Sequence, residues 1–182
     1  MSGLRLFVAV DLPAPVRAAL AALRDAADPA AWRPVPDASL HLTLAFLGYR
    51  PREDVATAAA VLDAAAGPAP RLALGAALLL PPRRARVLCA EVADPDGALA
   101  ALQGRVSDGL QVAGLYAPER RAYRGHVTVA RLRTGARSPR SVPAELASAP
   151  LAFSAEGLTL YRSHLARAGA SYEPLHRIAL GA

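Results

Sequence analysis

The 182-residue chain contains no lysine and only one cysteine, Cys89, and each shortage excludes a class of chemistry. Without lysine the protein cannot form a Schiff base, and it lacks the lysine of a phosphate-binding P-loop. A single cysteine excludes an internal disulfide and a thiolate metal cluster, and it fits a reducing compartment. All 21 basic residues are therefore arginine, and with a net charge of +6 they favour binding of phosphate groups.

Long apolar runs are also missing. The longest candidate, residues 72–80, is far too short to span a bilayer. Residues 1–10 lack the longer apolar region and the cleavage site of a signal peptide. We therefore expect a cytoplasmic protein that does not associate with membranes.

The distribution of apolar residues, Pro and Gly predicts one domain over residues 1–182 with the element order βαβαββαβ(α)ββ. Residues 32–39 are expected to form a Pro-rich loop, and Gly48 is expected to end the second strand. The expected strands cover residues 4–10, 40–46, 71–80, 86–93, 126–131, 151–162 and 172–180, and the expected helices cover 16–27, 55–66, 98–112 and a short segment at 141–147.

This order contains a rough duplication. A strand, a helix, a loop, a second strand and a second helix follow one another from residue 4, and the same succession recurs from residue 86. We therefore expect an α+β fold of two pseudo-symmetric lobes around a central cleft. Each lobe is expected to be a mostly antiparallel sheet with helices on the outside.

One tripeptide form occurs in both halves. His41-Leu-Thr43 and His126-Val-Thr128 lie 85 residues apart, each inside an apolar run. Random placement of the five Thr residues would produce two such pairs in about one sequence in two hundred. Because strand side chains alternate, each His shares one face with its Thr while the apolar neighbours share the other. The pattern predicts two strands that present both imidazoles to one cleft.

Two imidazoles beside one substrate can divide the roles of acid and base, because histidine titrates near neutral pH. Displacement at phosphorus needs this division: one group takes a proton from the nucleophile, and the other gives a proton to the leaving oxygen. The two Thr hydroxyls can donate hydrogen bonds to the non-bridging phosphate oxygens. The scheme requires neither a metal nor another cofactor.

The chain also resembles a known family over nearly its whole length. It is similar to the two-histidine phosphoesterases, and within them most similar to the RNA 2′,3′-cyclic phosphodiesterases, also called 2′-5′ RNA ligases. The segments that carry the resemblance are Arg5–Pro13, Leu40–Gly48, Arg121–Arg131, Gly157–Ser163 and Tyr172–Leu175.

The resemblance implies a role for each motif residue. His41 corresponds to the general acid that protonates the 3′-oxygen, and His126 to the general base that activates water, so that the product ends in a 2′-phosphate. Thr43 and Thr128 match the phosphate-binding positions. The implied substrate is an RNA or oligonucleotide with a 2′,3′-cyclic phosphate end, and no obligate protein partner is implied. One departure is Gly125, which stands where relatives commonly have Pro.

Three further residues near the motifs are candidates for RNA contacts. Arg131 follows the second motif, but strict alternation places it on the face opposite His126. Tyr123 and Arg124 precede that motif and are candidates for stacking on a base and for binding phosphate. Phe46 is also aromatic, but alternation places it on the core face, so we expect it to pack in the core.

Other readings of the sequence stay open. A non-catalytic RNA-binding module would be expected to have lost at least one His-x-Thr pair, and both are present. A metal-dependent hydrolase would need a third ligand near the histidines, and the sequence has no H-E-x-x-H motif or Asp-rich cluster. Joining of RNA ends through a 2′-5′ bond uses the same site in reverse.

Overall fold

The two strands that carry the His-x-Thr motifs lie side by side in the middle of one sheet. The computed structural model describes residues 3–137, 139–142, 150–166 and 169–181. In it β3 (Leu42–Arg50) pairs with β6 (His126–Leu132), and the strands follow the order β7-β4-β5-β6-β3-β1-β8-β9, with β2 paired to β6. The other strands are β1 (Leu4–Asp11), β2 (Trp32–Pro34), β4 (Arg71–Leu80), β5 (Val87–Ala93), β7 (Leu151–Ser154), β8 (Gly157–Ala166) and β9 (Gly169–Ala179).

The helices complete the α+β fold, and the predicted class and the mostly antiparallel sheet are confirmed. The described residues include the α-helices α1 (Ala14–Asp25), α2 (Asp54–Ala65) and α3 (Ala98–Val112), and a short 3₁₀ helix, η1, covers Asp37–Ser39. Instead of two separate sheets, the structure has one nine-stranded sheet, with four strands on each side of the β3–β6 contact and β2 off this path. None of the described helices is long and apolar enough to cross a membrane.

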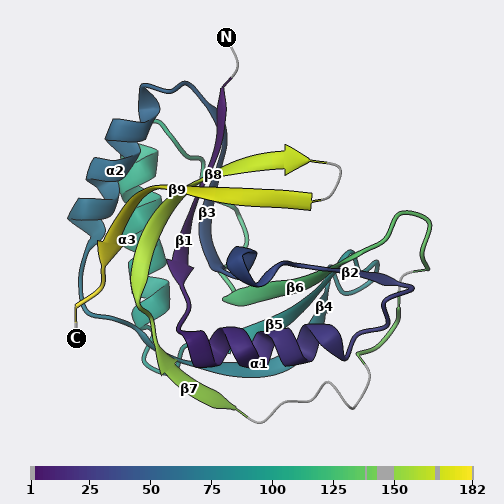
Figure 1. The fold of residues 1–182 in the computed structure, drawn as a ribbon. Coiled ribbons are helices and arrows are strands. Elements are labelled where there is room, and N and C mark those ends of the chain that lie inside the picture. The colour runs from purple at the N-terminus through teal and green to yellow at the C-terminus, as the bar shows by residue number, and fades with distance from the viewer. Residues whose placement is uncertain (1–2, 138, 143–149, 167–168, 182) are drawn as a thin grey trace.

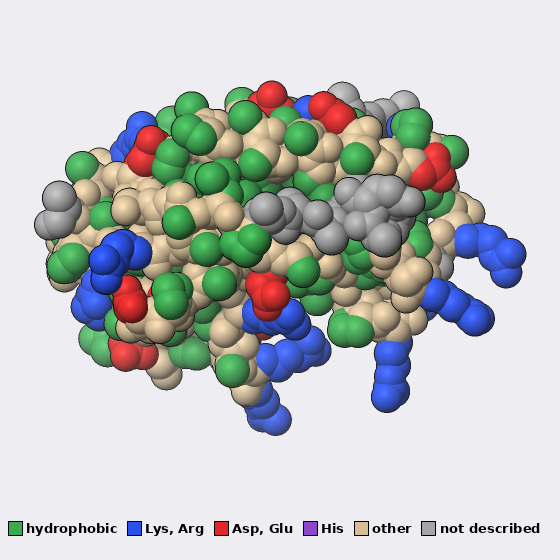
Figure 2. Space-filling view, turned by 90° about the horizontal axis from the view of Figure 1, so that it is seen from below, with side chains coloured by type: hydrophobic (Ala, Val, Ile, Leu, Met, Phe, Trp, Pro, Cys, Tyr) green, Lys and Arg blue, Asp and Glu red, His purple; other side chains and the backbone are tan. Residues whose placement is uncertain are grey.

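One face of the curled sheet forms the core. Leu6, Val8 and Val10 of β1 are buried there, as are Leu42 of β3 and Val127 of β6. Helices α2 and α3 pack against each other on one side of the molecule, and α1 packs near β6 (Figure 1). Because the helices cover the apolar face, the opposite face of β3 and β6 is left for the polar motif residues. Arg side chains project along one edge of the surface seen in Figure 2.

A β-bulge follows the Thr of each motif. On β3, Thr43 pairs with Ala9 and Ala45 pairs with Val8, so one residue of β3 is extra. On β6, Thr128 pairs with Cys89 and Ala130 pairs with Leu88, so one residue of β6 is extra in the same place. An extra residue reverses the alternation of side chains beyond it.

These bulges overturn two predictions that relied on strict alternation. Phe46 is not packed in the core but is 53% exposed and lines the same cleft as His41. Arg131 does not face away from His126 but lines that cleft as well. The two residues occupy equivalent positions, five residues after the His of their motif.

Several element boundaries also differ from the prediction. Residues 32–39 are not a plain loop, because they contain β2 and η1. The strand β3 continues past Gly48, which adopts a φ of 74° at a register shift. Residues 151–162 form two strands, because Ser154 pairs with β4 whereas the chain from Gly157 pairs with β1 at the other end of the sheet. The short helix expected at 141–147 falls largely outside the described residues.

We predict opposite effects for two glycines of α3. A Cβ at Gly109 would lie 2.7 Å from the Val61 Cγ1 atom of α2, whereas a Cβ at Gly104 would meet nothing within 4 Å. Gly109→Ala should therefore lower the free energy of unfolding by about 1–3 kcal/mol, because it overpacks the helix contact. Gly104→Ala should raise it by about 0.5–1 kcal/mol through helix propensity alone. Urea unfolding measures both; equal effects would contradict the close α2–α3 contact.

Candidate active site

His41 and His126 are held in the same way. The Nδ1 atom of His41 lies 2.7 Å from the carbonyl oxygen of Ser39, and the Nδ1 atom of His126 lies 2.9 Å from that of Arg124. A carbonyl oxygen can only accept, so Nδ1 donates in each case and carries the proton of the neutral ring. The Nε2 atom of each imidazole is therefore left to exchange a proton with a ligand.

Both histidines and both motif threonines line one cleft of about 460 Å³. The structure thus brings together His41, Thr43, His126 and Thr128, as the sequence pattern predicts. No Asp or Glu is among the described residues that line this cleft. The remaining polar or aromatic lining residues are Arg5, Arg33, Ser39, Phe46, Arg131 and Tyr172.

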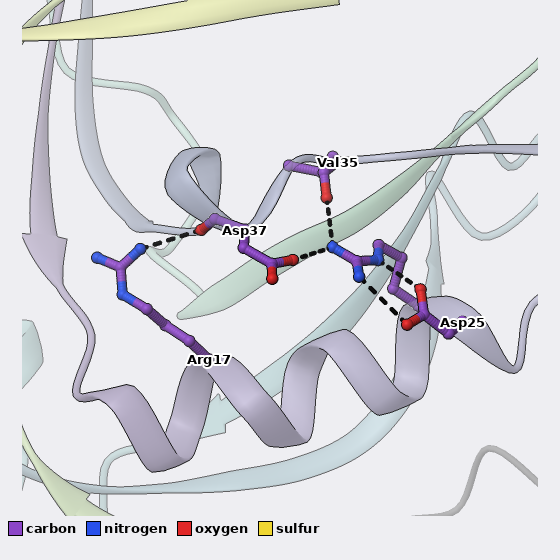
Figure 3. Close-up of polar contacts among 5 residues, drawn as sticks. Arg17, Asp25, Val35 and Asp37 are labelled. Atoms are coloured by element: carbon purple, nitrogen blue, oxygen red, sulfur yellow. Dashed lines mark hydrogen bonds and ion pairs between the residues drawn. The ribbon is translucent and has the colours of Figure 1, made fainter.

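The carbonyl group that orients His41 belongs to a loop fixed by α1. Arg17 donates a hydrogen bond to the carbonyl oxygen of Asp37 at 3.0 Å, and Arg24 donates to that of Val35 at 3.0 Å (Figure 3). Arg24 also forms an ion pair with the Asp37 carboxylate. Since η1 ends at Ser39, these contacts fix the residue that accepts the His41 hydrogen bond.

Burial in an aromatic cluster favours the neutral form of His41. Its ring centroid lies 4.8 Å from that of Phe7 and 5.0 Å from that of Tyr172, which meets it edge-on. Burial is the largest cause that lowers the pKa of His41 to about 4, and the nearby Arg131 lowers it further, against the opposing hydrogen bond to Ser39. In the ligand-free cleft His41 is thus neutral at pH 7.

The second motif is fixed from β5 and α3. The Gly125 carbonyl oxygen accepts a hydrogen bond from the Val92 amide at 2.9 Å. A Cβ at Gly125 would lie 3.1 Å from the Leu99 side chain and 3.2 Å from the Val92 carbonyl oxygen, so the close packing suits glycine here. The Arg124 side chain forms an ion pair with Glu91 at 2.7 Å, which fixes the residue whose carbonyl oxygen orients His126.

Thr43 and Thr128 are held by different contacts. The Thr43 carbonyl oxygen accepts a hydrogen bond from the Tyr123 hydroxyl at 3.0 Å. The Thr128 hydroxyl lies 3.6 Å from the Cys89 sulfur, a contact in which either group can donate. Burial raises the pKa of Cys89 to about 11, so the thiol stays protonated and unreactive at neutral pH.

The three candidate RNA contacts lie in different places. Arg131 lines the cleft, whereas Tyr123 and Arg124 line a second cavity of about 480 Å³ that shares Thr43 and His126 with it. Tyr123 is largely buried, and burial is the main cause that raises the pKa of its hydroxyl. Its hydrogen bond to Thr43 gives it a structural contact that the sequence did not indicate.

Sequence reasoning missed four polar or aromatic cleft residues, which are Arg5, Arg33, Ser39 and Tyr172. Arg5 has a usable signal, because it alternates with Leu4 and Leu6 of the core. Arg33 has no such signal in the sequence, because only the pairing of β2 with β6 places it opposite Arg131. The described residues contain no group of three or more His, Cys, Asp or Glu side chains arranged to hold a metal ion.

Comparison with known proteins bears on the family of the chain. A family model described as the 2′-5′ RNA ligase superfamily matches residues 12–167. An RNA 2′,3′-cyclic phosphodiesterase of Thermus thermophilus is 53% identical over 53 residues, a stretch that spans 29% of this chain and only 27% of that relative.

Solved structures match over nearly the whole chain. TT0787 of Thermus thermophilus superposes with a TM-score of 0.80 at 33% identity, covering 97% of both chains. E. coli LigT in complex with 3′-AMP superposes with a TM-score of 0.82 at 30% identity, covering 98% of both chains. With a family model that covers most of its length and these structural relatives, the chain belongs to the 2′-5′ RNA ligase superfamily.

Proposed function

We propose that this protein is a phosphodiesterase that hydrolyses the 2′,3′-cyclic phosphate end of RNA to a 2′-phosphate in the cytoplasm. The observation that carries the proposal is the matched orientation of His41 and His126, whose Nε2 atoms are left for ligands of one cleft. The described residues that line the cleft include arginines but no Asp or Glu, which suits an anionic substrate. A non-catalytic RNA-binding module would have no need for two imidazoles held in this way.

The proposed reaction needs two proton transfers. His126 Nε2 takes a proton from water as the water oxygen bonds to phosphorus. The bond from phosphorus to the 3′-oxygen then breaks, and His41 Nε2 gives its proton to that oxygen. The Thr43 and Thr128 hydroxyls donate to the non-bridging oxygens, where charge accumulates in the transition state. Water is added across one bond, and the ring opens to a 2′-phosphate.

The acid role requires His41 to gain a proton when substrate binds. Burial keeps this imidazole neutral in the empty cleft, with a pKa of about 4. An anionic phosphate beside the ring favours the charged form and also offsets the positive charge of Arg131. His41 is therefore charged as an acid only in the complex.

Joining of RNA ends is a second candidate activity, and one observation favours it. The second cavity reaches both Thr43 and His126, so it can hold the nucleoside whose 5′-hydroxyl replaces water. The same two histidines would then work with a nucleoside as the nucleophile.

We expect turnover of an oligoribonucleotide with a 2′,3′-cyclic phosphate end in the presence of EDTA. The rate should stay nearly unchanged by the chelator, because the scheme needs only the chain's own groups, and the product should carry a 2′-phosphate by nuclease mapping. His176→Ala is a matched control, since His176 pairs with Asp63 outside the cleft and should not affect turnover. A 3′-phosphate product, or activity restored only by a divalent ion, contradicts the proposal.

The acid and the base can be told apart with a substrate whose leaving group needs no proton. His41→Ala and His126→Ala should each lower the rate on the cyclic substrate about 10²–10⁴-fold. On a nucleoside 2′-(p-nitrophenyl phosphate), His41→Ala should recover most of its loss, whereas His126→Ala should stay impaired because water must still be activated. Equal recovery of the two variants would show that the roles are assigned wrongly.

The pKa of His41 should rise when phosphate occupies the cleft. NMR titration of the free protein should give a value near 4, and saturating inorganic phosphate should raise it by about one unit or more. Since the folded pKa lies below the unfolded value near 6.5, the associated stability is complete above pH 6.5 and is lost as the pH falls toward 4. His41→Gln should flatten this dependence. A His41 pKa unaffected by phosphate would contradict the acid role.

A further inference from the structure

Two arginines face each other across one edge of the cleft. Arg33 of β2 and Arg131 of β6 are directly opposite in the antiparallel register, and both line the cleft. Directly opposite side chains in such a pair have Cβ atoms about 4.5–5.5 Å apart, and like charges there are destabilising. Trp32, the neighbour of Arg33, is buried in the core, so Arg33 points to the opposite face.

Nothing in the described part of the chain compensates this pair of charges. The hydrogen bonds and ion pairs among the described residues include neither guanidinium group, and the described cleft lining has no carboxylate. Five arginines outside the cleft, at 24, 71, 124, 162 and 177, instead each form an ion pair with Asp or Glu. The cleft therefore keeps two adjacent cations ready for a ligand.

Arg33 and Arg131 are positive charges beyond the groups that the proposed reaction uses to bind the reactive phosphate. The reactive phosphate already has two imidazoles and two hydroxyls from the motifs, and these four groups surround it in the proposed reaction. On the other side of the cleft, Phe46, the counterpart of Arg131, lies with Arg5 of β1, whose guanidinium group donates a hydrogen bond to the Ser163 hydroxyl at 3.0 Å. Strand β2 adds Arg33 only at the β6 side. Of the three arginines among the described lining residues, two thus lie side by side at the β6 end, whereas Arg5 is held by Ser163.

We propose that Arg33, together with Arg131, forms a second anion subsite that binds the phosphodiester group preceding the cyclic end of the substrate. This inference rests on the proposed function and narrows its substrate class. A mononucleoside cyclic phosphate has one phosphate, which the motif groups occupy, whereas an oligonucleotide has another phosphate at the next linkage. The preferred substrate is therefore an RNA end of at least two nucleotides.

Three substrates with the same terminal nucleoside test this subsite. They are adenosine 2′,3′-cyclic phosphate, the adenylyl-adenosine dinucleotide with the same cyclic end, and that dinucleotide with an uncharged methylphosphonate linkage. The unmodified protein should have a kcat/KM about tenfold higher for the charged dinucleotide than for the other two. Affinities of the corresponding 2′-phosphate products, measured by calorimetry, should follow the same order and do not depend on turnover.

Arg33→Gln should remove this advantage. It should lower kcat/KM and product affinity about tenfold for the charged dinucleotide and by less than about twofold for the other two ligands. Arg71→Gln is the matched control: it also removes one exposed arginine, but on β4 outside the cleft, and should change none of the values. The ligand-free Arg33→Gln protein should melt at the same or a slightly higher temperature, because like-charge repulsion is relieved.

Equal losses for all three ligands would overturn the inference and assign Arg33 to the reactive phosphate. No loss for any ligand would overturn it as well. Absence of turnover with every substrate would contradict the proposed function instead, and the product affinities would still decide whether the second subsite exists.

Discussion

The site depends on a single backbone contact in the middle of the sheet. Leu42 and Val127 pair where β3 meets β6, and they are the central residues of the two His-x-Thr motifs. Both side chains are fully buried in the core. Because neighbouring residues of a strand point to opposite faces, burial of this pair forces both histidines and both threonines onto the other face. The hydrophobic effect that closes the sheet therefore also assembles the polar cleft.

A buried carboxylate supports the aromatic cluster around His41. Asp11, only 2% exposed, accepts hydrogen bonds from the hydroxyls of Thr159 and Tyr161 at 2.7 Å and pairs with Arg177 at 2.9 Å. These contacts tie β1 to β8 and β9. The Tyr161 ring stacks on Phe7, which in turn packs against His41. Asp11 thus holds together the cluster whose burial lowers the pKa of His41, although its own negative charge acts in the opposite direction and raises that pKa.

The sequence predicts most of the helices and the pairing of the motifs, since both follow from local apolar periodicity. The predicted orientations of Phe46 and Arg131 are wrong because a β-bulge depends on the register between two paired strands, and the sequence of one strand does not indicate it. The place of Arg33 in the cleft could not be predicted for a related reason. Strand β2 has three residues, too few for an alternating pattern, and it exists only because β6 offers an edge to pair with.

The β-bulge on β6 links the charge of Arg131 to the protonation of His41. By turning Arg131 toward His41, it places a cation near an imidazole that burial already keeps neutral. Each of these effects opposes protonation while the cleft is empty, and the negative charge of a phosphate bound in the cleft would offset both. In the proposed reaction, substrate binding and protonation of His41 are then thermodynamically coupled: a ligand that favours protonated His41 must bind more tightly when His41 is protonated. An uncharged ligand of the same shape would leave the imidazole neutral, so the proposed acid catalysis by His41 requires an anionic ligand.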